Sequence, residues 1–316
     1  MKKTHYIIVL AFILNSCDNM SLTVDLDLPP HDSQLVVNAV LQAGDDLSKV
    51  YVSHSLDPVS LNQYTQIDDA SVVLKENNTI IDDLTYQQDP SSGAENTFCY
   101  VTEVLLEENK SYQIEVSHAS YPTATAQEKI PTPVNIQSVE LGILSSYQQA
   151  CNFTINDPAG IDNYYLLRLK FKEKEMIWGE DPVKWYGLNY ESNEPSFEGN
   201  DPFDEGTQGR KVLFNDQLFD GNNKTFSLNI VYDFFNDFEF EEEIFYEEYE
   251  EIDSIKVVLY SVSEAYYNYH QSRRLQNQSD GSAILGAEPV VVYNNIQNGF
   301  GIFASKSKDE FSVATE

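Results

Sequence analysis

Short apolar runs, many of them rich in β-branched or aromatic residues, recur along the chain and are separated by clusters of Gly, Asn, Asp, Pro or Ser. Several runs alternate with a period of two, which is typical of strands with one buried face. Regular short strands bounded by such turns predict a β-sandwich, which we place at residues 32–132. Its expected strands are residues 34–41, 49–54, 70–76, 79–86, 97–104 and 111–118.

A second series of strand-like runs follows a junction that contains Pro131 and Pro133. The expected strands are residues 148–156, 163–173, 224–233 and 254–263. Residues 133–316 therefore form a second predicted sandwich. The sequence as a whole predicts an all-β fold with two immunoglobulin-like β-sandwich domains in tandem.

The second domain departs from the strand pattern in two places. Residues 176–209 combine Trp, Tyr and Phe with Gly, Asn, Pro and acids, which is the composition of a long irregular insertion. Residues 263–278 instead place apolar side chains near helical spacing. Ser263 is the expected N-cap and Glu264 lies in the first turn, so one short helix is predicted here. Its expected apolar residues are Ala265, Tyr266, Tyr269 and Leu275.

The end of the chain contains a further strand signal at residues 287–305, with Asn298 and Gly299 between two apolar runs. This pattern predicts a terminal hairpin that completes the second sandwich. Gly301 is expected where the backbone of another strand approaches closely.

The N-terminus differs from all of these segments. Lys2 and Lys3 precede a short apolar run at residues 7–14, and this order is typical of a secretory signal peptide over residues 1–16. The run is too short to span a bilayer as a helix, which needs about 20 residues. Cleavage would leave Cys17 as the first residue.

The motif Leu14-Asn15-Ser16-Cys17 resembles a bacterial lipobox, in which the cysteine is lipidated. The resemblance implies lipidation at Cys17, and several acyl chains anchor a protein far better than one. An ordinary signal peptide with a coincidental cysteine is the alternative. Residues 17–31 are polar and acidic and end near Pro29-Pro30, so we expect an extended tether between the lipid and the folded body.

Charge limits the partners of the chain. It contains 51 Asp and Glu against 19 Lys and Arg, for a net charge of −32. We expect no binding to nucleic acid or anionic headgroups through a general basic surface, and membrane contact through the lipid anchor only. The 41% hydrophobic and 12% aromatic content supplies a core and argues against disorder. Cys99 and Cys151 fall in different predicted domains, which favours free thiols over a disulfide.

No catalytic motif stands out in the chain. There is no G-x-S-x-G, no H-E-x-x-H, no glycine-rich phosphate loop and no C-x-x-C. We therefore expect no enzymatic activity and no resident cofactor, although members of a triad need not be near one another in sequence.

One acidic loop raises the question of calcium. Residues 198–206 hold four acids, three of them in a loop turned by Gly and Pro residues, and flexible oxygen ligands suit Ca²⁺. A solvated loop without an ion is the other interpretation. The candidate ligands are Asp201, Asp204 and Glu205.

A second acidic run, residues 233–251, interleaves ten acids with seven aromatic residues. Two interpretations remain open: a solvated face whose rings dock on the sandwich, or a contact surface formed together with the aromatic insertion. Buried rings can anchor a partner, and carboxylates can steer a basic one. The candidate partner-binding residues are Trp178, Trp185, Tyr186, Phe235, Phe238, Phe245 and Tyr249.

Five stretches resemble, in order, the lipoproteins of domain of unknown function family 4249, which are found mainly in Bacteroidota. They are "LVVNAVL", "PTPVNIQSV", "INDPAGIDNYYLLRL", "VSEAYYNYHQS" and "EPVVVYNNIQNGFGIFAS". The resemblance implies two immunoglobulin-like domains on an outer-membrane lipid anchor, encoded near TonB-dependent outer-membrane receptors. It carries no catalytic residues. It also implies display on the cell surface, while few acids follow Cys17, so the periplasmic face stays open as the alternative.

These observations favour a non-enzymatic accessory lipoprotein that binds or assembles with a TonB-dependent transporter. A free-standing adhesive or structural surface lipoprotein is the alternative. A hydrolase that uses dispersed carboxylates is a third hypothesis, which a pocket lined by an acid pair would favour.

Overall fold

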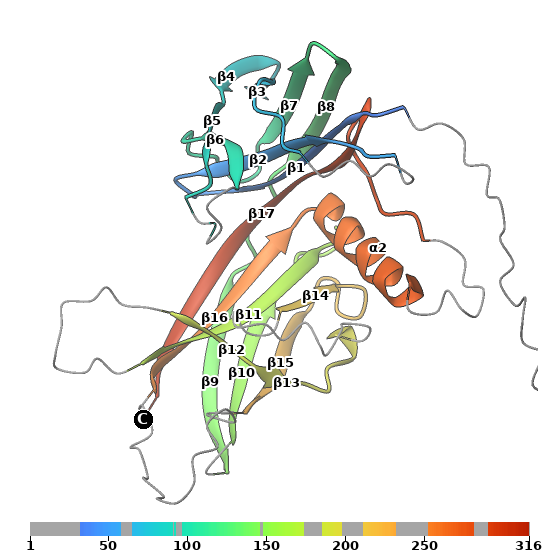
Figure 1. The fold of residues 1–316 in the computed structure, drawn as a ribbon. Coiled ribbons are helices and arrows are strands. Elements are labelled where there is room, and N and C mark those ends of the chain that lie inside the picture. The colour runs from blue at the N-terminus through green and yellow to red at the C-terminus, as the bar shows by residue number, and fades with distance from the viewer. Residues whose placement is uncertain are drawn as a thin grey trace, which may run out of the picture. The chain divides into compact units, whose positions relative to one another are not determined.

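The fold comes from a computed structural model of the chain (Figure 1). The residues that it describes are 32–57, 65–90, 92, 97–145, 148–173, 185–197, 211–231, 252–280 and 290–315. The predicted signal peptide, tether and acidic run at residues 233–251 lie outside this set.

The first half of the described chain is built from short strands. They are β1 (Leu35–Gln42), β2 (Ser48–His54), β3 (Ser71–Glu76), β4 (Thr79–Asp83), β5 (Thr85–Gln88), β6 (Phe98–Thr102), β7 (Ser111–His118) and β8 (Tyr121–Lys129). Alternation of buried and half-exposed side chains, as along β1, gives most of these strands one apolar face.

The second half adds further strands, a 3-10 turn and one helix. They are β9 (Ile136–Ser145), β10 (Gln148–Asn156), β11 (Tyr164–Glu173), β12 (Tyr186–Leu188), β13 (Tyr190–Glu191), η1 (Pro195–Phe197), β14 (Lys211–Asn215), β15 (Asn223–Val231), β16 (Ile252–Val262), α2 (Glu264–Asp280) and β17 (Gly299–Ala314). The predicted all-β fold with one helix is confirmed.

The described strands form three sheets. The largest has nine strands in the order β12-β11-β16-β17-β1-β2-β6-β5, with β14 also paired to β11. One four-stranded sheet has the order β4-β3-β7-β8, and the other has the order β13-β15-β10-β9. The large sheet therefore contains strands from both halves of the chain.

Two separate cores fill the space between these sheets. One buries side chains of β1 and β2 against those of β3, β7 and β8, with Leu35, Val37 and Ile114 among its members. The other buries β11 and β16 against β10 and β15, with Phe153 and Phe226 stacked at its centre. Each half is thus a sandwich, and both sandwiches use the same large sheet.

The strand β17 connects the two sandwiches. Its first half pairs in parallel with β1, from Gly299 opposite Leu35 to Lys306 opposite Gln42. Its second half pairs antiparallel with β16, from Lys306 to Ala314. Figure 1 shows this single strand, in red, running beside both sets of strands.

The predicted terminal hairpin at residues 287–305 is wrong for the part of it that the structure describes. Residues 290–296 form no strand, because side chains replace the backbone ladder there. Asn295 donates from Nδ2 to the carbonyl of Phe303 at 2.7 Å and accepts from its N–H at 2.9 Å. The segment therefore lies against β17 without becoming its hairpin partner.

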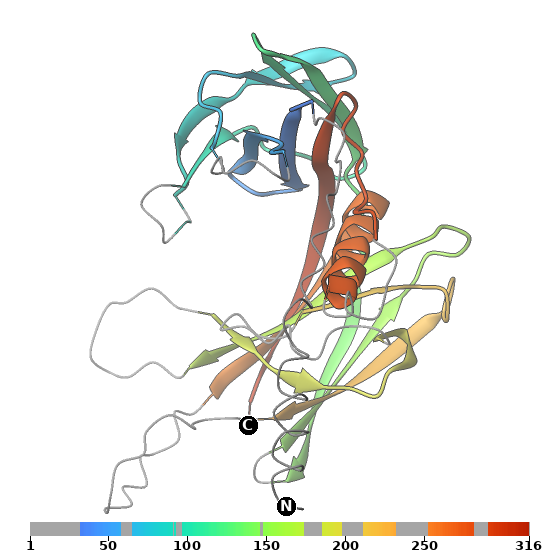
Figure 2. The same cartoon turned by 45° about the vertical axis from the view of Figure 1, so that its right-hand side comes forward.

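The helix α2 begins where the sequence predicts it. Ser263 Oγ accepts a hydrogen bond from the N–H of Tyr266 at 3.3 Å, as an N-cap does. Ala265 packs with Ile302 and Ala304 of β17, so α2 covers the face of the large sheet opposite the core, as Figures 1 and 2 show. Leu275, expected on the apolar face, is instead 47% exposed.

The structure describes residues 185–197 of the predicted insertion, and these are not irregular. Residues 185–197 contain β12, which pairs with β11, and β13, which pairs with β15. Leu188, Tyr190 and Phe197 are buried in the second core. Several of the rings in this stretch therefore serve packing.

Cys99 and Cys151 are both buried and free. Cys151 lies in the second core, and burial raises its pKa to about 12. A thiol that stays protonated is a poor nucleophile, so Cys151 acts as a packing residue. Among the described residues no helix has both the length and the apolarity to cross a bilayer.

Candidate functional site

Two of the predicted partner-binding residues, Trp185 and Tyr186, belong to the described part of the chain. The remaining predicted site residues lie outside the described residues. They are Cys17, Trp178, Phe235, Phe238, Phe245 and Tyr249, and the calcium candidates Asp201, Asp204 and Glu205.

Trp185 and Tyr186 lie at the end of the nine-stranded sheet. Tyr186 opens β12, the terminal strand in the sheet order, and it is opposite Phe171 with ring centroids 5.4 Å apart. Its side chain is 40% exposed. The Nζ of Lys256 lies 4.1 Å from the centroid of the Trp185 ring, so that ring is held by a cation–π contact. The structure therefore places both residues together at a sheet edge.

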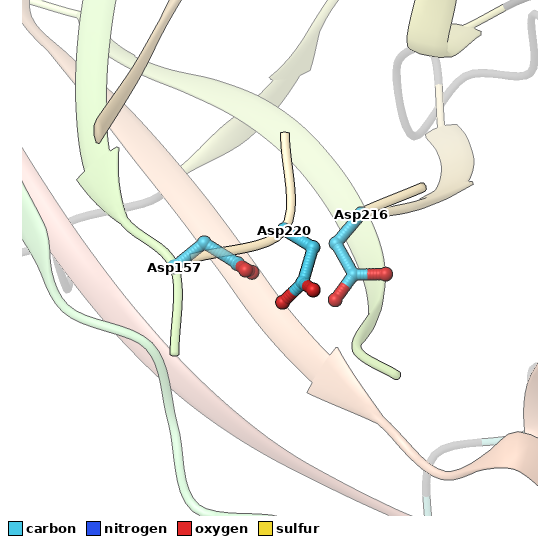
Figure 3. Close-up of side chains that lie close together, drawn as sticks. All are labelled: Asp157, Asp216 and Asp220. Carbon is cyan, nitrogen blue, oxygen red and sulfur yellow. The ribbon is translucent and has the colours of Figure 1, made fainter. Parts of the chain in front are cut away.

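A cluster of three carboxylates, missed by the sequence analysis, lies in the second sandwich. Asp157 follows β10, Asp216 follows β14, and Asp220 lies in the turn before β15. One oxygen of each lies within 4.8 Å of the others, and Figure 3 draws Asp220 between the other two. A usable sequence signal exists, since two of these residues directly follow a strand.

Asp157 is held firmly in this cluster. It is buried, its Oδ1 accepts a hydrogen bond from the Tyr165 hydroxyl, and its Oδ2 accepts from the N–H of Gly221 at 2.9 Å. Burial raises its pKa, the two hydrogen bonds oppose this effect, and the charges of Asp216 and Asp220 raise the pKa further.

The other two carboxylates are also hydrogen-bonded. Asp216 Oδ2 accepts from the N–H of Asn163 at 2.8 Å, and Asp220 Oδ1 accepts from the N–H of Gly160 at 2.8 Å. The loop after β10 is thereby tied to the turn that precedes β15. Three carboxylates have the oxygen chemistry of a calcium site. Their hydrogen bonds give them a second role, which is to brace two adjoining loops.

Glu128 on β8 is a further titratable group. Its pKa is raised to about 7, mainly by burial; hydrogen bonds from the Lys129 N–H and from Ser263 oppose this effect, and the charge of Glu264 adds to it. Ser263 and Glu264 begin α2, while the nearby Ser305 donates from Oγ to the carbonyl of Lys129 at 2.8 Å. A carboxyl with a pKa near neutrality thus lies where β8, α2 and β17 meet.

Comparison with known proteins yields one family. No curated protein matches the chain. The family model described as Domain of unknown function (DUF4249) matches residues 22–312, which includes both cores and nearly all of β17. The protein belongs to the DUF4249 family.

Proposed function

We propose that this protein is a non-enzymatic lipoprotein, anchored in the outer membrane through Cys17, that binds a TonB-dependent transporter as an accessory component. The lipobox-like motif supports the anchor, and the resemblance described above supports the transporter as partner. The arrangement of Trp185 and Tyr186 supports a contact site on the folded body.

The single observation that carries the proposal is the exposed Tyr186 ring on a terminal strand. A terminal strand offers backbone groups without a neighbour in its own sheet, and partners commonly pair with such strands. Tyrosine adds a large ring with few rotatable bonds, which makes it a common anchor of interfaces. Both features favour contact with another protein.

An affinity purification from gently solubilised outer membranes tests the proposal. The native lipoprotein carries a C-terminal tag, and the expected result is co-purification of a TonB-dependent receptor near equal amounts. Tyr186→Ala lowers the recovery of the receptor, whereas Leu218→Ala, which removes another exposed apolar side chain, does not. Cys17→Ala serves as the unanchored control.

Recovery of the lipoprotein alone, in a detergent that preserves other membrane complexes, would refute the transporter role and favour the adhesive or structural alternative. Digestion of intact cells with an impermeant protease reports separately on the membrane face. Loss of the intact band without lysis is the result expected for surface display.

A further inference from the structure

The face of the nine-stranded sheet that points away from the second core is unusually basic. Tyr165, Leu167 and Leu169 of β11 point into that core, so the alternate residues of β11 point to the other face. The same alternation applies to β14, β16 and β17. The resulting basic face consists of Arg168, Lys170, Lys172, Lys211, Lys256, Lys306 and Lys308.

Strand register brings these cations close together. Arg168 is opposite Lys211 on β14, and Lys170 is opposite Lys256 on β16. Seven of the 19 basic residues of the chain therefore share one face of one sheet, although the chain as a whole carries a net charge of −32. The charge of the molecule is strongly segregated.

Carboxylates compensate only part of this charge. Glu310 pairs with Lys256 at 3.2 Å and with Lys308 at 3.0 Å, and Asp253 pairs with Lys172 at 3.5 Å. Lys170, Lys211 and Lys306 form no ion pair with any residue that the structure describes. Among the residues that the structure describes, the basic face thus carries an excess of positive charge.

The electrostatics of Lys306 and Lys170 reflect this excess. The pKa of Lys306 is lowered to about 8, mainly by burial; the charge of Asp45 opposes this effect, and the charges of Arg168, Lys308 and Lys211 add to it. Burial also lowers the pKa of Lys170, as do Arg168, Lys308 and Lys256. An anion on this face would relieve the repulsion among these cations.

The aromatic residues of the face argue for the kind of anion. Lys256 Nζ lies over the Trp185 ring, and Lys306 Nζ lies 4.7 Å from the centroid of the Tyr260 ring. Both rings are therefore engaged by lysines, and stacking on a sugar would have to displace these contacts. Carboxylates or other simple anions need only the ammonium groups themselves.

The spacing of the cations favours a peptide. Arg168, Lys170 and Lys172 stand at alternate positions of one strand, which separates them by about 6.7 Å. An extended peptide with an acid at every second position has the same repeat. We propose that the basic face binds an extended acidic segment of a partner protein, with alternate carboxylates aligned along β11 and β16. This inference does not depend on which partner the exposed Tyr186 contacts.

Fluorescence anisotropy of the full chain, purified in detergent, tests the inference. The probe is a fluorescein-labelled (Glu-Ser)6 peptide, with (Gln-Ser)6 as the neutral comparison. The acidic peptide binds saturably. Its affinity falls as the salt concentration rises from about 50 to about 300 mM, because the added ions screen the attraction between the lysines and the carboxylates. The neutral peptide does not bind.

A pair of charge-matched variants locates the site. Lys170→Gln, Lys256→Gln and Lys308→Gln together weaken binding about tenfold or more, because local charges dominate at short range. The control combines Lys75→Gln, Lys110→Gln and Lys224→Gln, which lie on other sheets or loops and remove the same charge. The control changes the affinity by no more than about twofold. Circular dichroism checks that both are folded, and Lys170→Gln alone replaces the triple variant if it is not.

Three results would overturn the inference. Absence of saturable binding to the wild-type protein would refute it. This holds even if the cause is that acidic residues of the chain itself occupy the basic face and exclude the probe. Equal loss in the control variant would show a general charge effect. Stronger binding of a heparin oligosaccharide, lost with the same three lysines, would assign the face to a glycan. None of these results bears on co-purification of a transporter, so the two proposals fail independently.

Discussion

At the scale of single residues, Gly301 marks the tightest contact between β17 and β1. Its φ is +113°, a conformation that residues with a Cβ rarely adopt. A Cβ at this position would lie 2.1 Å from the carbonyl oxygen of Val37. Close approach of two backbones therefore requires glycine here, as the sequence indicates.

Gly301→Ala should lower the free energy of unfolding by about 3 kcal/mol or more, because it combines backbone strain with a steric clash. Gly142→Ala is the control, since the nearest atom to its added Cβ is 3.7 Å away and its φ is ordinary. Urea denaturation measures both. Equal stability of the two variants would contradict the close approach.

Glu128 provides a prediction of pH dependence. Its folded-state pKa is raised to about 7 from 4.5, so its contribution to stability is fully present below pH 4.5 and is lost as pH rises through 7. Glu128→Gln, which imitates the protonated form, should raise Tm at pH 8 and change it little at pH 5. Thermal unfolding at both values, with exposed Glu140→Gln as control, measures this. A gain in Tm at pH 5 as large as the gain at pH 8 would argue against a raised pKa for Glu128.

At the scale of elements, Ser263 joins α2 to β17. Its Oγ caps the helix and also accepts from the buried N–H of Ser305 at 3.1 Å. Ser263→Ala should cost about 1–3 kcal/mol, because it removes the cap and leaves a buried donor without its partner. Ser312→Ala, at an exposed position of β17, should change stability by less than about 0.5 kcal/mol. Similar losses in both variants would refute the joining role.

Local patterns predicted most individual elements because side-chain alternation and capping act over a few residues. Many strands of both cores and the start of α2 follow from such patterns, whereas β8, β9 and β14 were not expected. The parallel pairing of β17 with β1 does not, because it joins Gly299 to Leu35 across most of the chain. The apolar run before Gly299 has the pattern of a strand. The Asn295 side chain takes the hydrogen bonds of the Phe303 backbone instead, and a single asparagine produces no periodic pattern that would reveal this.

The sites show the same limit. Tyr186 is a candidate partner-binding residue because the sequence around it is rich in aromatic residues, and it is indeed exposed. The same aromatic content applies equally to Tyr190 and Phe197, which are buried. The carboxylates of Asp157 and Asp216 meet only because β10 and β14 end close together in space. The basic face depends on the register between strands that are far apart in sequence. The net charge of −32 gives no indication that cations gather on one face.

At the scale of the whole molecule, the shared strand should couple the two sandwiches. Because β17 is paired with strands of both sandwiches, unfolding of one sandwich should disrupt the pairing in the other. Differential scanning calorimetry should therefore show a single unfolding transition. Leu35→Ala in the first core and Phe226→Ala in the second should each cost about 3–5 kcal/mol and should move that whole transition to lower temperature. Two peaks, of which each variant shifts only one, would show independent domains.

The most direct measurement of the proposed role is site-specific photocrosslinking in intact cells. A benzoylphenylalanine replaces Tyr186 in one strain and Leu218, an exposed apolar residue of the same sandwich, in another. We expect the probe at position 186 to crosslink to one TonB-dependent receptor, identified by mass spectrometry, and the probe at position 218 not to do so. Absence of a crosslink at position 186, or the same products from both positions, would contradict the proposed role.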